Sequence, residues 1–236
     1  MLTDPQRFNL YAYVRNSSLR FMDPSGENIE LIGTAEERQR ELEAIQNAVG
    51  GGAAAKSLTI VEEDGRFYVD AGDLQSFSTI SDLAASFASL LSKETEVAQL
   101  ELASQYQNLG LTDPATGLPR HLSDQRGNGV TGRDSSDQLH IYLDRDCCSP
   151  GDVQNFAPAK GFLNKVEFYS NYLGYLAIGL VSDKGTVLGH EAGHAIYMMG
   201  HRDSSFERAA SDKSALDLEN KVRQAKAPGS PVRVVH

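Results

Sequence analysis

The amino-acid sequence predicts an α+β domain with a small mixed sheet. Three observations support this class. Apolar residues recur at helical spacing from Val187 to Met199, strand patterns occur within residues 58–69 and 139–143, and a second helical pattern fills residues 211–226. A chain of 236 residues with 40% hydrophobic content can bury one sizeable core. We therefore expect one main domain.

The N-terminal elements are marked by capping and turn residues. Thr34 and Glu37 form a capping box, which predicts a helix that ends at the glycines of residues 50–52. Strand-forming residues on both sides of Asp64-Gly65 predict a β-hairpin. These signals are local, so each predicts its element without knowledge of the fold.

The middle of the chain gives weaker patterns. Apolar residues from about Thr79 onward predict one long amphipathic helix: Ile80, Leu83, Phe87, Leu90, Leu91 and Val97. Residues 110–136, rich in Gly, Pro, Asp and Arg, are interpreted as a long loop. The apolar runs 166–169 and 172–181 fit either a strand or a buried helix, because short runs do not separate the two.

Leu139-His140-Ile141-Tyr142-Leu143 alternates as a strand should. We expect an edge strand here, to which an extended substrate could add as one more strand. His140 is then either a substrate contact or an ordinary strand histidine.

His190, Glu191 and His194 form the pattern HExxH within an apolar helical segment. Two histidines four positions apart lie one turn apart on one helix face, where both imidazoles can bind one Zn²⁺. Glu191 between them can take a proton from a water bound to the ion and deliver it to a leaving amine. The alternative is two ordinary histidines on a core helix.

A catalytic zinc ion usually takes three protein ligands, so the chain must supply one more. On the predicted helix 211–226, Glu219 lies within the apolar face, and an inward carboxylate needs a partner such as a metal. Asp217 has lysines at i−4 and i+4, which indicates a solvated face. His201 and Glu207 are the other candidates, together with Asp203. The alternative for Glu219 is a salt bridge with Arg223 at i+4.

Residues 7–27 carry a second set of motifs. The segment Asn9-Leu10-Tyr11-Ala12-Tyr13-Val14-Arg15-Asn16 and the boundary motif Asp23-Pro24-Ser25-Gly26 resemble the end of an RHS-repeat core, with Ser17-Ser18 in place of the usual Asn-Pro. The resemblance implies two parts: residues 1–27 as the end of an RHS carrier, and residues 28–236 as an interchangeable toxin domain. It also implies delivery into a neighbouring cell by a specialised secretion system, as in interbacterial competition, and a cognate immunity protein.

The last fifty residues or so carry a further resemblance. His190-Glu191-Ala192-Gly193-His194 followed by Glu219-Asn220-Lys221-Val222-Arg223 resembles the injected effector metalloproteases, in which HExxH precedes an E-N-x-x-R helix. The resemblance implies a zincin-like fold of the gluzincin layout, with His190, His194 and Glu219 as zinc ligands and Glu191 as the catalytic residue. We further expect Tyr197, His201 and Arg223 to lie next to the ligands and to hold them in position without binding the ion.

The composition limits the partners. A formal net charge of −10 argues against nucleic acid, which normally binds a basic patch. No signal peptide is expected at Met1, and no apolar run approaches the roughly 20 residues that a membrane span requires. The sequence therefore predicts a soluble, delivered zinc endopeptidase that cleaves a protein in the target cell. The alternatives are a metal-dependent toxin of another chemistry, such as a deamidase, and a non-catalytic metal-binding module.

The only cysteines are the adjacent pair Cys147-Cys148. Neighbouring cysteines bridge only through a strained eight-membered ring, and thiolate zinc ligands are normally spaced further apart. We therefore expect two reduced thiols in a loop.

Overall fold

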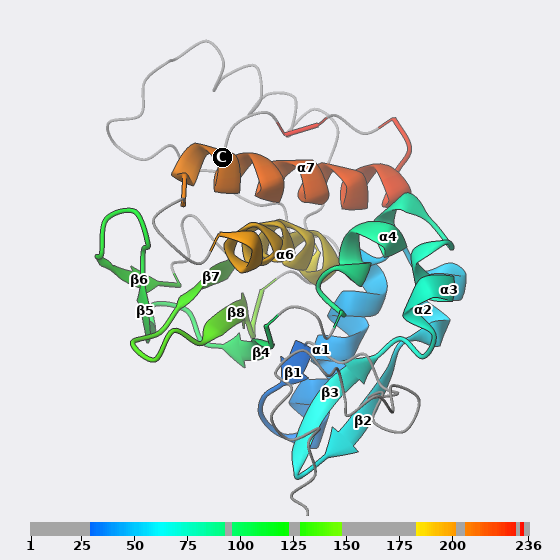
Figure 1. The fold of residues 1–236 in the computed structure, drawn as a ribbon, viewed down its shortest axis with the longest axis horizontal. Coiled ribbons are helices and arrows are strands. Elements are labelled where there is room, and N and C mark those ends of the chain that lie inside the picture. Colours follow the sequence, from blue (N-terminus) through cyan, green and yellow to red (C-terminus); the bar gives the residue numbers. More distant parts are fainter. Residues whose placement is uncertain are drawn as a thin grey trace, which may run out of the picture.

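The computed structural model describes residues 29–92, 96–122, 128–147, 183–201, 206–229 and 232–233. The predicted carrier segment 1–27, with Asp23, Pro24 and Gly26, lies outside these residues, as do the apolar runs 166–169 and 172–181. Helices and one mixed sheet make up the described part, which confirms the α+β class (Figure 1).

The sheet has eight strands in the order β2-β3-β1-β4-β8-β7-β5-β6. Their bounds are β1 Ile29–Leu31, β2 Thr59–Glu63, β3 Arg66–Asp70, β4 Ala98–Ala103, β5 Asn108–Thr112, β6 Pro119–His121, β7 Gly129–Arg133 and β8 Leu139–Asp144. Strands β1, β4 and β8 are mutually parallel, and the other pairings are antiparallel. The sheet is thus mixed, as predicted, and larger than expected.

The helices of the described part lie on the sheet and beside it. Their bounds are α1 Ala35–Ala48, α2 Gly52–Ser57, α3 Leu74–Ser78, α4 Asp82–Ala88, α6 Lys184–Gly200 and α7 Arg208–Lys226. Helix α6 packs on β7 and β8 and is covered on its other side by α7 (Figure 1). None of the helices in the described ranges is long and apolar enough to cross a membrane.

Two glycines let α7 approach α6 closely. A Cβ atom on Gly193 would lie 2.5 Å from the backbone oxygen of Ser214, and one on Gly189 would lie 2.6 Å from Val222 Cγ2. Real side chains do not tolerate such distances. The glycine pair therefore permits α7 to bring its polar residues onto the histidine face of α6.

The local predictions for the N-terminal elements are confirmed. Thr34 caps α1, its side chain accepts from the Glu37 backbone N–H, and Glu37 reaches back to the Thr34 N–H. Strands β2 and β3 form the predicted hairpin, in which Asp64 and Gly65 have φ angles of 51° and 78°. Positive φ at both turn positions is what a tight two-residue hairpin requires.

The long helix predicted from Thr79 is wrong. Helix α4 begins at the Ser81 cap and is followed by Leu90 and Leu91, which are buried outside any helix, and then by β4. In β4, buried apolar residues alternate with half-buried polar ones. Over so few residues, this alternation cannot be distinguished from helical spacing in the sequence.

The long loop predicted for residues 110–136 is also wrong. This segment contributes to β5 and supplies β6 and β7. Its residues have weak strand propensity, but β7 is held by pairing along β8 from Gly129↔Leu143 to Arg133↔Leu139. Tertiary pairing overrides propensity here.

Residues 139–143 do form a strand, but not the predicted edge strand. Strand β8 pairs with β4 on one side and β7 on the other, so its backbone groups are occupied and cannot take an added substrate strand. His140 instead lies 3.2 Å from Asp134 Oδ2 and stacks on Tyr142. It is an ordinary strand histidine with protein partners.

Cys147 is disulfide-bonded, so the expectation of two reduced thiols is wrong. The chain contains one other cysteine, Cys148, which lies outside the described residues.

Candidate functional site

His190 and His194 lie on α6 one turn apart, as their spacing predicted. Their ring centroids are 5.0 Å apart and the ring planes are nearly perpendicular, at 79°. Asp183 caps the start of the helix, and its carboxylate accepts from the Thr186 N–H at 2.8 Å. His194 is buried and His190 is partly buried. The two imidazoles therefore share one helix face under the cover of α7.

Helix α7 supplies a polar partner to each histidine. The Nδ1 atom of His190 lies 2.7 Å from Glu219 Oε2, and that of His194 lies 2.8 Å from Ser211 Oγ. A metal-ligating histidine typically uses its second ring nitrogen in this way, because the partner fixes the tautomer and the ring orientation. With both Nδ1 atoms engaged, Nε2 is the atom through which each ring would bind an ion.

Glu219 is the centre of a buried charge cluster. Its Oε1 accepts from Arg223 Nε at 3.0 Å and from the Arg223 guanidinium at 2.6 Å, while Oε2 accepts from Arg233 at 3.0 Å. Burial disfavours the charge of Glu219, but the hydrogen bond with His190 and the charges of Arg233 and Arg223 hold the pKa of its carboxyl well below the ordinary value. The salt bridge with Arg223, considered as an alternative from the sequence, is thus present alongside the contact with His190.

Asn220 ties the C-terminal segment to this cluster. Its side-chain Oδ1 accepts from the Arg233 N–H and its Nδ2 donates to the Arg233 C=O, both at 2.7 Å. One amide thus pairs with both backbone groups of one residue, as a neighbouring strand would. This clamp holds the Arg233 guanidinium over Glu219.

Glu191 lies toward the sheet and not toward α7. Its Oε2 accepts a hydrogen bond from Thr131 Oγ1 on β7 at 2.8 Å, and its side chain passes so close to Gly129 that a Cβ there would lie 2.7 Å from Glu191 Cγ. The Glu191 side chain is buried at 6% exposure. Strand β7 therefore fixes the position of this carboxylate.

Two further charged groups lie around the site. Burial lowers the pKa of Arg120 on β6, although the negative charges of Glu191 and Asp212 act in the opposite direction. Burial raises the pKa of Asp212 on α7, although the positive charges of Arg208, His190 and Arg120 act in the opposite direction. Arg120 also donates to the Thr131 backbone oxygen. The site is thus bounded by an arginine from the sheet and a carboxyl from α7.

The other candidate residues lie elsewhere. His201 stacks on Tyr197 with ring centroids 4.0 Å apart and caps α6 two turns beyond His194, roughly 10 Å along the helix axis. Glu207 is the exposed N-cap of α7, and its backbone N–H donates to the Tyr197 hydroxyl. Asp217 pairs with Lys213 on the solvated face, as predicted. Asp203 lies outside the described residues.

The donor chemistry at α6 suits zinc, since imidazole is a preferred zinc ligand and Glu219 is a carboxylate beside it. Within the described ranges, however, no group of three or more His, Cys, Asp or Glu side chains is arranged to hold a metal ion. Glu219 meets His190 at Nδ1, on the opposite side of the ring from Nε2. Glu219 thus orients His190, and its role as a third ligand stays a prediction.

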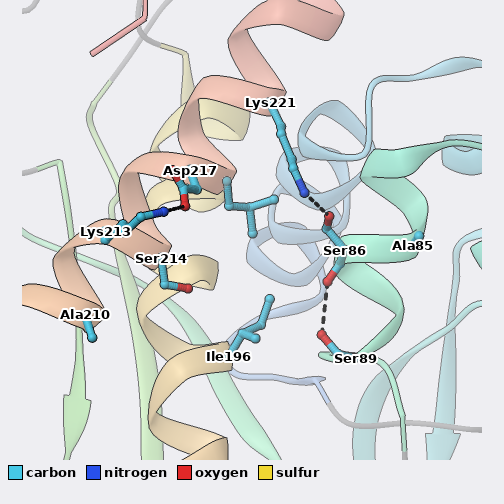
Figure 2. Close-up of a pocket in the computed structure, with 10 residues that line it drawn as sticks. Ala85, Ser86, Ser89, Ile196, Ala210, Lys213, Ser214, Asp217 and Lys221 are labelled. Atoms are coloured by element: carbon cyan, nitrogen blue, oxygen red, sulfur yellow. Dashed lines mark hydrogen bonds and ion pairs between the residues drawn. The ribbon is translucent and has the colours of Figure 1, made fainter. Parts of the chain in front are cut away.

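A groove of about 460 Å³ lies between α4, α6 and α7 (Figure 2). Lys221 there donates to Ser86 Oγ on α4 at 3.0 Å, and Lys213 pairs with Asp217. Ile196 comes from α6, but neither histidine of HExxH nor Glu191 lines the groove. It is therefore separate from the candidate site.

Four site residues were not identified from the sequence: Thr131, Ser211, Arg120 and Arg233. Each contacts a partner that is distant in the sequence. The separation is 60 positions for Thr131 and Glu191 and 17 positions for Ser211 and His194. A search for hydroxyl residues on an inward helix face would have found Ser211, because it lies on the same helix as Glu219. No local signal marks the others.

Comparisons with protein-family models, with curated proteins and with solved structures found no match to this chain.

Proposed function

We propose that this protein is a zinc-dependent endopeptidase whose ion is held by His190 and His194. The observation that carries the proposal is the pair of Nδ1 contacts, because α7 places a hydrogen-bonding side chain beside Nδ1 of each histidine of HExxH. Two unrelated core histidines would have no reason to share this arrangement. The proposed zincin-like identity of the fold rests on the same helix pair.

The residues of the chain have separate roles in this proposal. A bound zinc ion would act as a Lewis acid and lower the pKa of water to roughly 7. Glu191 accepts the proton of the attacking water and passes it to the leaving amine. Glu219 holds His190 at Nδ1, and Arg233 and Arg223 keep Glu219 charged. As the third ligand predicted from the sequence, Glu219 would have to exchange its contact with His190 for the ion.

The biological setting is proposed from the sequence. The RHS-like residues 1–27 imply a carrier, so the peptidase would be a toxin that a specialised secretion system delivers into a target cell. Its partners would be a protein substrate in that cell and an immunity protein in the producer. A purely structural zinc site is disfavoured because such sites fill all four positions with protein ligands, usually including cysteine thiolate, and Cys147 is disulfide-bonded.

The central test compares wild type with Glu191→Gln in target-cell lysate, with new peptide termini measured by mass spectrometry and zinc by elemental analysis. Glu191→Gln keeps the shape but removes the proton acceptor, so new termini should disappear while about one zinc per chain remains. His190→Ala should lose both. Equal production of termini by Glu191→Gln and wild type would refute peptide hydrolysis at this site, and a metal-dependent reaction of another kind, such as deamidation, would give modified side chains without new termini.

Glu219 is tested by its effect on metal affinity. The carboxylate of Glu219 is needed whether Glu219 binds the ion or orients His190. Glu219→Ala should therefore weaken zinc binding by at least about tenfold. Asp217→Ala, on the solvated face of the same helix, is the matched control and should bind zinc as wild type does. If Glu219→Ala bound zinc as tightly as the control, Glu219 would be neither ligand nor orienting group.

A further inference from the structure

We propose that Thr131 on β7 is a positioning residue for Glu191, and that Gly129 makes room for the Glu191 side chain. The inference rests on the proposed function, because it assigns a role in proton transfer. The contact itself joins two elements that no sequence motif connects, a strand at one side of the sheet and the helix above it.

The hydrogen bond is placed to hold one oxygen of the carboxylate. Thr131 is fully buried, and its Oγ1 lies 2.8 Å from Glu191 Oε2 and 3.0 Å from the Glu191 backbone oxygen. A hydroxyl carries a single proton, and a charged acceptor forms the stronger bond. The proton therefore goes to Oε2, and Oε1 is the oxygen that we assign to accept the proton from water.

Strand geometry brings both residues to the same side. Positions 129 and 131 are two apart, so they face one surface of the sheet. The register Gly129↔Leu143 and Thr131↔Ile141 holds both against the central strand β8. At Gly129, a Cβ would also lie 3.0 Å from Val187 Cγ1 and 3.1 Å from the Tyr142 backbone oxygen. A side chain at this position would therefore push Glu191 and α6 away from the strand.

The backbone of Thr131 is held from a second direction. Arg120 on β6 donates to its carbonyl oxygen, so the residue is fixed by a side chain as well as by β8. A donor anchored in this way limits the carboxylate to one position. A displacement of about 1 Å in a reacting group can cost on the order of a hundredfold in rate, so this restriction matters for proton transfer.

The test uses Thr131→Val, which keeps the shape without the hydroxyl, and Thr131→Ser, which keeps the hydroxyl. Two readouts are needed: the rate of new peptide termini in target-cell lysate by the zinc-loaded full chain, and the ¹³C chemical shift of the Glu191 side-chain carboxyl in metal-free protein, assigned by its loss in Glu191→Gln. Thr131→Val should lower the rate by roughly tenfold to a hundredfold with zinc content unchanged, and should move the carboxyl signal. Thr131→Ser should restore both to near wild type.

The outcomes separate this inference from the proposed function. If Thr131→Val keeps the wild-type rate and carboxyl signal, Thr131 does not position Glu191. If wild type itself yields no new termini, the proposed function fails, and the carboxyl signal alone decides the contact: movement in Thr131→Val with recovery in Thr131→Ser upholds it, and an unmoved signal overturns it. Thr131→Ala is the second hydroxyl-free variant, used in the same comparison if the valine variant does not fold.

Discussion

Glu41 is an acidic residue of α1 that is buried in the apolar core, where α1 packs against β4. Its Oε1 accepts from the Leu102 N–H at 3.1 Å, and Oε2 has no hydrogen-bond partner among the described residues. Strand β1 ends at Leu31, opposite Leu100, so it does not reach the Leu102 N–H. Glu41 thus accepts a hydrogen bond from the Leu102 N–H, which β1 is too short to reach. Burial raises the pKa of its carboxyl to about 8.

This raised pKa predicts a pH dependence of stability. An unfolded glutamic acid ionises near 4.5, whereas Glu41 in the fold stays protonated until about pH 8. Its contribution to the free energy of unfolding is therefore full below about pH 4.5 and declines as pH rises to about 8, by an amount on the order of several kcal/mol. Glu41→Gln, which cannot ionise, should lack this decline.

Urea unfolding at several pH values checks the prediction. The difference in unfolding free energy between Glu41→Gln and wild type should grow in favour of the variant from pH 5 to pH 8, because other groups titrate alike in both proteins. A difference that stays constant across this range would show that Glu41 ionises normally in the fold.

At the level of single residues, the sequence predicted only what spacing can encode. His190, Glu191 and His194 were predictable because one turn of helix fixes their relation, and Glu219 because it is a carboxylate on an apolar helix face. That Glu219 would meet the Nδ1 atom of His190 depends on the register of two helices. Spacing within one helix says nothing about that register.

The packing of α6 on α7 depends on glycine at the contact. Gly193→Ala should force the helices apart, since its Cβ would meet the α7 backbone at 2.5 to 2.8 Å, and we expect a loss of unfolding free energy of about 1 to 3 kcal/mol together with weaker zinc binding. Gly200→Ala in the same helix is the control. Among the described residues, apart from its chain neighbours and the nearby backbone of its own helix, no atom lies within 4 Å of the position that a Cβ would take, so the change should be neutral or slightly stabilising.

Thermal unfolding and zinc affinity of the two variants check this packing prediction. A Gly193→Ala protein as stable as Gly200→Ala would contradict the close approach of α6 and α7 at Gly193.

Among the elements, those with caps or tight turns were predicted and those stabilised by pairing were missed. The capping box of α1 and the Asp64-Gly65 turn act within a few residues, so the sequence contains the whole signal. Strand β7 contains two glycines and a buried threonine, and it is a strand because β8 lies beside it. The edge position of β8 was wrong for the same reason, since β7 was interpreted as loop.

For the whole molecule, the position of β1 predicts where the chain can be shortened. Strand β1 is an interior strand between β3 and β4, beginning at Ile29. If residues 1–26 belong to the proposed carrier, deleting them should leave zinc content, unfolding temperature and peptide hydrolysis nearly unchanged. Deleting residues 1–31 removes β1 and should prevent folding.

Circular dichroism, elemental analysis and the lysate assay compare the two truncations. A folded, zinc-bound protein lacking residues 1–26 but without activity would place that segment in the catalytic domain.

The candidate site is distributed over three separate parts of the chain. Thr131 on β7 contacts Glu191 on α6 from 60 positions away, and Glu219 on α7 meets His190 from 29 positions away. An extended chain therefore has none of these contacts. A polypeptide threaded through a narrow conduit would be chemically silent in transit and would acquire its reactive centre only on refolding at the far side. If the proposed delivery takes this form, the chain would have no active site while it is in transit.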